Sequence, residues 1–387
     1  MSKRKVLFIT PSLCQGGIEH SLITMLKLLD KTKYDLTLFT YRDDMTLLPL
    51  VPKEVRVVTD ENKPHYYRKP KAVFYSALKS VAQKLKMKKF SEKIAEKLKV
   101  YIHQQKVKHP AKDIFKNEQF DVVVSYAVGI CTEMALFFEN SKHFVFYHSS
   151  VDMHHDKLQK LLPRYDAVIG VSDGVKEMIC TNYPLVKSKV TVIENYVDAQ
   201  QIAEKSNEPL DLSTGNKLRL CTCGRLSEEK GFDLAVETAR ILKEKDIKFV
   251  WYFVSDGTER QKIQSLIEQY SLNKNIIITG YLENPYPYYK ACDIYVQPSY
   301  HESFGLTIKE AVILGKTVVS TKTFGACTIL ENGKYGEIVE ISSKSLANEI
   351  LIAIEREKKG LYKKYELNDN IKEKEIYINK IDELLSQ

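Results

Sequence analysis

The chain has 387 residues, of which 44% are hydrophobic, and this length favours two globular domains over one. No apolar run reaches the roughly 18 residues that a membrane-spanning helix needs. The seven cysteines are an odd number and include no Cys-x-x-Cys pair, which argues against a disulfide framework or a zinc site and favours buried thiols in a reducing cytosol.

The first half of the chain alternates short apolar strands with helical patterns. A helix is predicted over 18–29, after the turn at Gly16 and Gly17, and a second helical pattern includes residues 135–138. This alternation predicts a doubly wound α/β sheet. The Gly-Gly turn lacks the GxGxxG spacing of a dinucleotide site, and a tight turn that needs positive φ explains it equally well. The strands are predicted at 5–10, 36–41, 55–58, 121–125, 143–147, 166–172 and 190–193.

The net charge of +8 is concentrated between residues 68 and 116. That segment contains fifteen basic and three acidic residues and therefore has a net charge of +12. Apolar residues recur within it at helical spacing, for example Phe74, Leu78 and Val81. Such a basic amphipathic segment favours contact with an anionic lipid surface or another polyanion. A solvated helical face is the alternative interpretation.

The pattern restarts after a polar stretch over 200–216. Helices are predicted between the later strands and twice more at the end of the chain, over 344–357 and 370–385. Two successive doubly wound sheets explain this order better than one very large sheet. The second set of strands is predicted at 218–223, 249–254, 276–279, 293–296 and 317–320.

Polar residues follow three strands of the second half. Arg225 and Lys230 come after one strand, Asp256 after the next, and Glu302 precedes a helix that contains Glu310. Loops at the carboxyl ends of parallel strands converge on one cleft. Cations and helix amides suit a phosphate, and carboxylates suit sugar hydroxyls, so the pattern favours a nucleotide-sugar site. Exposed surface glutamates are the alternative for Glu302 and Glu310.

Three stretches of the chain resemble the retaining glycosyltransferases of family 4, of the bacterial surface-polysaccharide type. They cover residues 16–19, 224–233 and 298–311, the last of which contains the Glu-x7-Glu pair. The resemblance implies the GT-B fold, in which two Rossmann-like doubly wound domains face each other across a cleft. It implies an acceptor-binding domain over 1–198, with 68–116 as an insertion, and a donor-binding domain over 199–369. The final helix, in 370–387, is expected to return to the first domain.

The resemblance also implies the roles of individual residues. Arg225 and Lys230 would bind the donor diphosphate and stabilise the leaving nucleotide, Glu302 would hold the donor sugar, and Glu310 would hold the ribose. His148 matches a position near the donor sugar, although a structural histidine is the alternative there, and His154 and His155 would be acceptor-side or surface residues. The remaining donor-binding residues would be Gly16, Gly17, Asp256, Gly257, Ser303, Phe304, Gly305 and Leu306.

The sequence departs from the family pattern in two places and lacks one common motif. Ser255 stands where the family usually has glycine, and residues 323–332 match the family's glycine-rich, glutamate-bearing loop only loosely. No Asp-x-Asp triplet occurs in the chain, so neither a metal nor another cofactor is expected and the positive charge must come from protein.

The function that these observations predict is a hexosyltransferase of the EC 2.4 class. It would move a hexosyl or N-acetylhexosaminyl unit from a nucleotide sugar, with UDP expected, to a glycan or lipid-linked acceptor in surface polysaccharide synthesis. Retention by same-face displacement is expected, in the cytoplasm at the inner face of the plasma membrane, with no nucleic-acid partner. Two alternatives stay open: an epimerase or phosphorylase of the same fold, and a membrane- or polyanion-binding protein with a vestigial sugar site.

Overall fold

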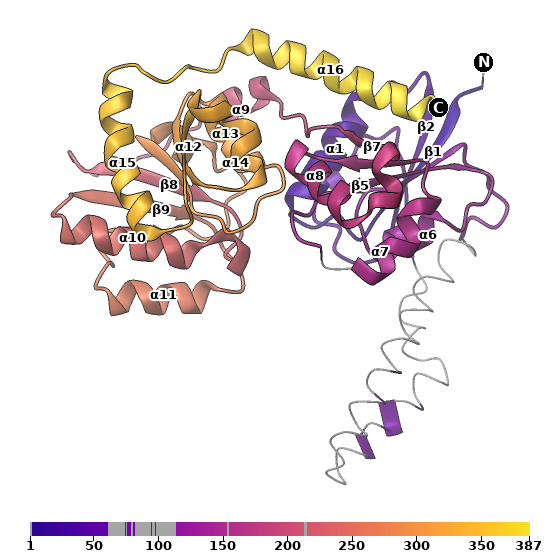
Figure 1. Ribbon diagram of the computed structural model, residues 1–387, viewed down its shortest axis with the longest axis horizontal. Coiled ribbons are helices and arrows are strands. Elements are labelled where there is room, and N and C mark those ends of the chain that lie inside the picture. Colours follow the sequence, from indigo (N-terminus) through magenta and orange to yellow (C-terminus); the bar gives the residue numbers. More distant parts are fainter. Residues whose placement is uncertain are drawn as a thin grey trace.

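The computed structural model describes residues 2–60, 114–152, 155–212 and 215–387, together with a few positions between 74 and 97. Its strands form two separate sheets, each covered by helices (Figure 1). The predicted basic segment at 68–116 lies almost entirely outside the described residues, and so does His154. The predicted contact of this segment with a membrane therefore stays a prediction.

The first sheet has seven parallel strands in the order β3-β2-β1-β4-β5-β6-β7. Helices α1 (Gly17–Leu28), α6 (Ile130–Ala135), α7 (His155–Leu161) and α8 (Asp173–Asn182) accompany it. Strand β1 is buried on both faces, because Val6, Leu7, Phe8 and Ile9 have no exposed surface. Continuous apolar runs of this kind are typical of parallel strands between two helix layers. The strands are β1 (Arg4–Thr10), β2 (Tyr34–Thr40), β3 (Arg56–Thr59), β4 (Val122–Ser125), β5 (Lys142–Tyr147), β6 (Ala167–Gly170) and β7 (Val190–Val192).

The second sheet has six parallel strands in the order β10-β9-β8-β11-β12-β13. Its strands are β8 (Leu218–Cys223), β9 (Phe249–Val254), β10 (Ile276–Ile278), β11 (Ile294–Gln297), β12 (Thr317–Thr321) and β13 (Gly336–Val339). Its helices are α10 (Phe232–Glu244), α11 (Arg260–Gln269), α12 (Tyr286–Ala291), α13 (Leu306–Ile313), α14 (Phe324–Ile329) and α15 (Ser343–Lys358), and α9 (Ala199–Lys205) precedes β8. Two doubly wound sheets were predicted, and this prediction is confirmed.

The carboxyl edges of the two sheets face each other. Arg225, which follows β8, donates a hydrogen bond from Nη2 to the carbonyl oxygen of Gln15, which follows β1, at 3.0 Å. Ser172, which follows β6, donates from Oγ to the carbonyl oxygen of Ser303, which follows β11, at 2.7 Å. The loops at the carboxyl ends of both sheets therefore meet between the domains, where ligands bind in folds of this kind.

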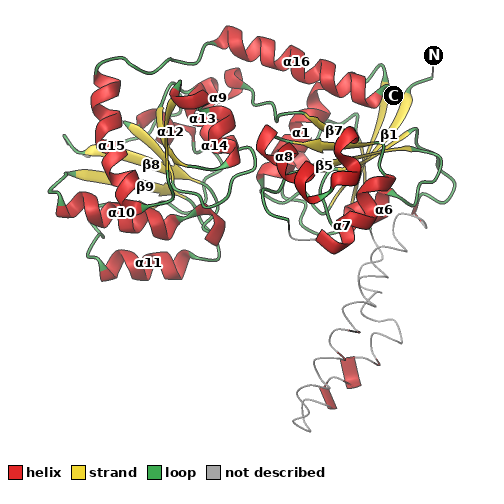
Figure 2. Ribbon diagram, in the orientation of Figure 1, coloured by secondary structure: helices red, strands yellow, loops and turns green. Residues whose placement is uncertain are grey.

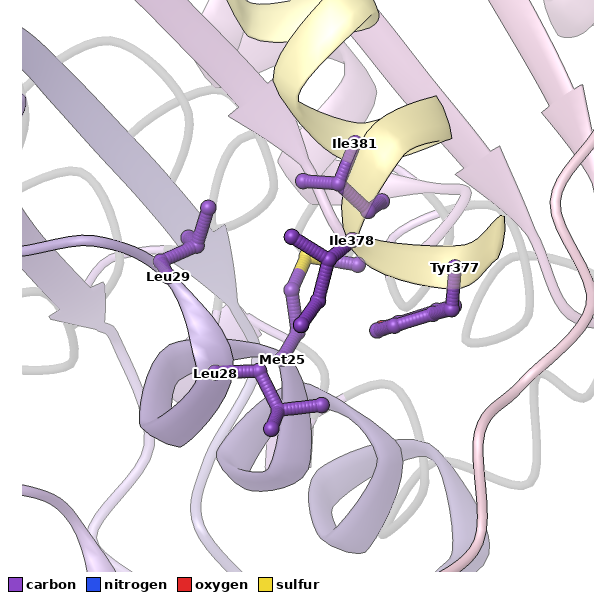
Figure 3. A pocket seen from close by; sticks show the side chains of 6 residues that line it. All are labelled: Met25, Leu28, Leu29, Tyr377, Ile378 and Ile381. Atoms are coloured by element: carbon purple, nitrogen blue, oxygen red, sulfur yellow. The ribbon is translucent and has the colours of Figure 1, made fainter. Parts of the chain in front are cut away.

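The last helix, α16 (Leu367–Leu385), packs against the first sheet (Figure 1, yellow). Tyr377 and Ile381 are buried in the same core as α1, and a small apolar pocket remains between the two helices (Figure 3). Lys33 forms an ion pair with Asp382 at 2.6 Å. The chain thus begins and ends on the same domain.

Some local predictions were wrong. Residues 136–138 were predicted to belong to a helix, but α6 ends at Ala135. The segment 323–332 was read as a loop, but it contains α14, whose first turn is capped by the Thr323 hydroxyl accepting from the amide of Ala326 at 3.3 Å. Such a short helix has too few residues for a periodic signal. Figure 2 shows the helices of both domains in red. Within the described ranges, none of them combines the length and apolar character that crossing a membrane requires.

Candidate active site

The loop after β8 is shaped by glycines and packs on the neighbouring loops. Gly231 has φ of +64°, and a Cβ there would collide with the carbonyl oxygen of Pro298. Gly257 has φ of +157°, and a Cβ there would collide with the carbonyl oxygen of Leu226. Only glycine avoids both the strained φ and the collision at each position. These contacts bring the Arg225–Lys230 loop against the loops that hold Asp256 and Glu302.

Lys230 and Glu302 form a direct ion pair. Lys230 Nζ lies 2.7 Å from Glu302 Oε1, and the side chains are 24% and 7% exposed. The same carboxylate oxygen accepts hydrogen bonds from Ser299 Oγ at 2.9 Å and from Gln297 Nε2 at 3.1 Å. Three donors on one oxygen hold the buried side chain of Glu302 in a fixed orientation. The sequence prediction that these two residues share one cleft agrees with this geometry.

Glu310 is held by two tyrosines of α12. Tyr286 OH donates to Oε1 at 3.3 Å and Tyr289 OH donates to Oε2 at 3.1 Å. Burial raises the pKa of Glu310 to about 7, and the two tyrosine hydroxyls partly oppose this rise. Glu310 can therefore exist in either protonation state near neutral pH.

The N-terminus of α13 presents backbone amides that could bind an anion. Gly305 has φ of +82° and precedes Leu306, the first residue of the helix. The first amides of a helix have no partner within it, and they favour anions. The amide of Gly325, in α14, donates to the carbonyl oxygen of Glu302 at 3.0 Å, and Phe304 is buried. This hydrogen bond and the burial of Phe304 thus fix the backbone of residues 303–306.

Gly16 and Gly17 allow the first domain to reach this site. A Cβ at Gly16 would collide with the carboxylate of Glu19, and a Cβ at Gly17 would lie 3.1 Å from Leu306 Cδ1. Glu19 itself is buried in the first turn of α1. Burial raises its pKa, while its hydrogen bonds and the charge of Arg225 lower it. Cys14 Sγ donates to Glu19 Oε1 at 3.3 Å.

His148 lies in the first domain, after β5. Its ring packs against Tyr126, with centroids 4.8 Å apart, and against Phe146 at 6.0 Å. Its Nε2 is buried and has no hydrogen-bond partner among the residues that the structure describes. Burial lowers the pKa of His148 to about 3, so the ring is neutral at physiological pH. His148 therefore cannot supply positive charge to a leaving group.

Asp256 is the most exposed of the predicted carboxylates. Its Oδ2 forms an ion pair with Arg260 at 3.0 Å, and its Oδ1 accepts from the amide of Gly257 at 2.8 Å. Its backbone carbonyl accepts from the amide of Leu226 at 2.8 Å. The contacts of Asp256 therefore brace the Arg225 loop. Ser255, the departure from the family pattern, donates its hydroxyl to the carbonyl oxygen of Gly224.

Four residues with evident contacts to the site were not predicted from the sequence. Gln297, Tyr286 and Tyr289 hold the two motif glutamates, and Glu19 supports the Gly16 turn. A sequence signal existed for Glu19, which belongs to the same motif as Gly16 and Gly17. The tyrosines give only an i, i+3 pair on a short helix, which a packing role explains equally well.

The arrangement combines two cations with two carboxylates. Arg225 is an exposed cation beside the Gly16 turn, and Lys230 is a second cation that is paired with Glu302. Glu302 lies in the loop between β11 and α13, and Glu310 lies in α13. Such a site can bind a diphosphate through the cations and amides and bind hydroxyl groups through the carboxylates.

Two family models match most of the chain between them. The model described as "Glycosyl transferases group 1" matches residues 204–374, and the one described as "Glycosyltransferase Family 4" matches residues 98–201. The boundary between the two matches falls within α9.

Curated relatives are similar over part of their length. An N-acetylgalactosaminyltransferase of Campylobacter jejuni, named for an N-acetylgalactosamine-N,N'-diacetylbacillosaminyl-diphospho-undecaprenol acceptor, is 26% identical over 48% of this chain and 49% of its own. A putative colanic acid biosynthesis glycosyltransferase, WcaL of Salmonella typhimurium, is 29% identical over 49% of this chain and 48% of its own. The chain spans about half the length of these relatives.

Solved structures match over nearly the whole chain. HepE of Anabaena in complex with UDP superposes with a TM-score of 0.70 at 19% identity and covers 99% of both chains. A TarM mutant of S. aureus, solved with UDP and other ligands, has a TM-score of 0.67 at 13% identity and covers 97% of this chain and 100% of its own. At such low identity these matches show a shared fold alone.

Proposed function

Because the chain belongs to the family 4 glycosyltransferases and has their GT-B fold, we propose that it transfers a hexosyl or N-acetylhexosaminyl unit from a UDP-sugar to a glycan or lipid-linked acceptor. One observation supports this most strongly. Lys230 and Glu302 meet at 2.7 Å beside the N-terminus of α13, and Arg225 lies across from the Gly16 turn. Cations, amides and a fixed carboxylate are thus gathered where a sugar diphosphate fits.

Each predicted residue has a place in this proposal. Arg225 and Lys230 bind the diphosphate, together with the backbone amides of 303–306 and the turn at Gly16 and Gly17. Glu302 binds hydroxyls of the donor sugar, and Glu310 accepts the ribose hydroxyls. Asp256 and Gly257 hold the Arg225 loop in place through their contacts with Leu226. Lys230 would exchange part of its contact with Glu302 for the diphosphate.

We propose that the anomeric configuration is retained by same-face displacement. The leaving diphosphate carries the developing negative charge, and Arg225, Lys230 and the helix amides stabilise it. Its departing oxygen takes the proton of the acceptor hydroxyl. Glu302 is assigned to the hydroxyls of the donor sugar and not to the anomeric carbon, so no covalent glycosyl-enzyme is expected. The neutral ring of His148 can position the sugar without adding charge.

Metal-independent chemistry is part of the proposal. The sequence has no Asp-x-Asp triplet, whose paired carboxylates could bridge a metal ion to a diphosphate. Arg225 and Lys230 provide two positive charges from the protein itself. Arginine offers paired donors to phosphate oxygens, and lysine a compact charge.

The acceptor and the location of the reaction are also proposed. The Campylobacter jejuni relative is named for a diphospho-undecaprenol acceptor, which supports a lipid-linked acceptor at the inner face of the plasma membrane. The other relative is named for colanic acid synthesis, which supports a surface polysaccharide as the product. The net charge of +12 in residues 68–116 supports attraction to anionic lipid.

A thermal-shift screen without divalent metal tests the donor site. UDP and UDP-sugars should raise the melting temperature, because a ligand that binds only the folded protein stabilises it. The base-matched control is uridine, which lacks the diphosphate and should give a much smaller shift. Protection that depends on magnesium would contradict the metal-independent proposal. A UDP-sugar that is epimerised without any acceptor would contradict the transferase proposal itself.

A further inference from the structure

Gln297 is a buried amide at the end of β11 that no motif singles out. Its side chain is in the core, with 1% of the residue exposed. The side-chain amide makes four hydrogen bonds, all to other side chains. Its Oε1 accepts from Tyr295 OH at 2.9 Å and Thr307 Oγ1 at 3.2 Å, and its Nε2 donates to Ser299 Oγ at 2.8 Å and Glu302 Oε1 at 3.1 Å. A fully satisfied buried network of this kind is rigid.

The partners fix which way the amide points. The Glu302 carboxylate, paired with Lys230, can only accept, so Nε2 must face it. Ser299 gives its hydrogen to Glu302 and therefore accepts from Gln297. The opposite face of the amide accepts the hydroxyls of Tyr295 and Thr307. One side chain thus links Glu302, through its NH₂ group, to the hydroxyls of Tyr295 and Thr307, through its carbonyl oxygen.

Gln297 also lies between the two motif glutamates. On one side it bonds Glu302. On the other it bonds Tyr295, whose ring stacks on Tyr289 with centroids 4.8 Å apart and an angle of 17° between the planes. Tyr289 OH in turn donates to Glu310 Oε2 at 3.1 Å. The carboxylate proposed to bind sugar and the one proposed to bind ribose are therefore connected through a continuous set of buried contacts.

We propose that Gln297 is a positioning residue that sets the orientation of Glu302 and thereby the selectivity for the donor sugar. This inference rests on the proposed function, since it assigns Glu302 to the sugar. Oε1 of Glu302 is held by Gln297, Ser299 and Lys230, so the direction in which Oε2 points is fixed as well. A hydroxyl that is inverted at one sugar carbon would meet Oε2 at the wrong angle, and its hydrogen bond would be lost.

Two replacements separate this role from simple packing. Gln297→Glu changes one NH₂ group to an oxygen. It keeps the acceptor that Tyr295 and Thr307 use, and it replaces the donor toward Glu302 with a second negative charge. Gln297→Met keeps the length and removes both functions without adding charge. Thr222→Val is the matched control, because Thr222 is a fully buried hydroxyl of the adjacent strand β8 that bonds Val296 and the Trp251 ring nitrogen but not Glu302.

The experiment measures UDP release from a panel of UDP-sugars that differ at single hydroxyls, without acceptor, along with UDP binding and thermal stability. For Gln297→Met we expect UDP affinity within about twofold of wild type. Its preference in kcat/KM for the best donor over the nearest epimer should fall about tenfold, the loss typical of a hydrogen bond to a charged group. Gln297→Glu should lose the same preference and also bind UDP more weakly, because Lys230 is then shared between two carboxylates. Thr222→Val should lose stability only.

The outcomes are distinguishable. If both Gln297 variants keep the wild-type donor preference, or if Thr222→Val loses it equally, Gln297 has a packing role and the inference is overturned. If one Gln297 variant does not fold, the other decides the question. If wild-type protein neither binds UDP nor releases it from any UDP-sugar, the proposed function itself is wrong, and this inference falls with it.

Discussion

Replacing Glu310 with glutamine should stabilise the second domain at alkaline pH. Glu310 is surrounded by Tyr286 and Tyr289, and its burial raises its pKa from 4.5 to about 7. In the unfolded chain the same carboxyl ionises near its ordinary value. Between these two pH values the folded protein holds a proton that the unfolded chain has released, so the free energy of unfolding falls as pH rises.

The size of the effect follows from the two pKa values. A pKa unit corresponds to about 1.36 kcal/mol, so the full difference sets an upper limit of about 3 kcal/mol. This stability is fully present below about pH 4.5 and is lost as pH passes 7. Glutamine does not titrate and can still accept one tyrosine hydroxyl. Relative to wild type, Glu310→Gln should therefore gain up to about 3 kcal/mol in free energy of unfolding between pH 5 and pH 8.

Denaturant unfolding followed by tryptophan fluorescence measures this difference in the free energy of unfolding for the second domain, which contains Glu310. Trp251 is the single tryptophan of the chain and is fully buried in β9 of the second sheet. The matched variant is Tyr289→Phe, which removes a hydroxyl that lowers the pKa of Glu310 and should shift the transition to higher pH. A difference between Glu310→Gln and wild type that is the same at pH 5 and pH 8 would refute the reasoning, and so would a less stable variant at pH 8.

Three further predictions concern the proposed reaction. Lys230→Ala should lower turnover about 10²- to 10³-fold, as is typical when one preorganised charge-stabilising donor is lost; steady-state kinetics showing an effect below about threefold would contradict this role. Binding of a UDP-sugar, whose diphosphate has no titrating proton near pH 7, should release protons, because ribose hydroxyls that donate to Glu310 would favour its charged form; calorimetry in buffers of different ionisation enthalpy would show no buffer dependence if Glu310 does not bind the ribose. Vesicles with anionic lipid should bind the protein at low salt and release it at high salt. Replacing the four lysines between residues 84 and 89 with glutamine should weaken this binding without changing the affinity for UDP. Equal binding to neutral vesicles would contradict the electrostatic account.

Most of the strands could be predicted because they are short apolar runs. Strand β13 (Gly336–Val339) was not predicted, because glycine and glutamate begin it and leave only two apolar residues. Residues 218–223 and 249–254 were predicted as strands with the bounds that the structure has. Strand β9 is buried along its whole length and β8 over residues 220–222, so tertiary burial leaves a clear local signal there. The position of Arg225, Lys230 and Glu302 near one another followed from a topological rule, since loops at the carboxyl edge of one parallel sheet converge.

What could not be predicted depends on contacts between residues far apart in the sequence. Lys230 and Glu302 are both in motifs, but their ion pair exists only because Gly231 permits close packing against Pro298. The neutral state of His148 results from burial beside Tyr126, which lies on the loop after β4. The pKa of Glu310 likewise depends on burial, which raises it, and on two tyrosine hydroxyls from α12, which lower it. Sequence patterns report local periodicity, whereas these properties arise from the assembled environment.

The central claim is that this chain is a retaining glycosyltransferase that uses a nucleotide-sugar donor. Proton NMR during turnover of the UDP-sugar that gives the largest thermal shift tests it most directly, since the anomeric signal of the first product is resolved before mutarotation. The account predicts that a donor with an α anomeric bond yields an α product with release of UDP, in the absence of divalent metal, and that Lys230→Ala slows this signal. An initial β product, or no UDP release with any donor that binds, would contradict it.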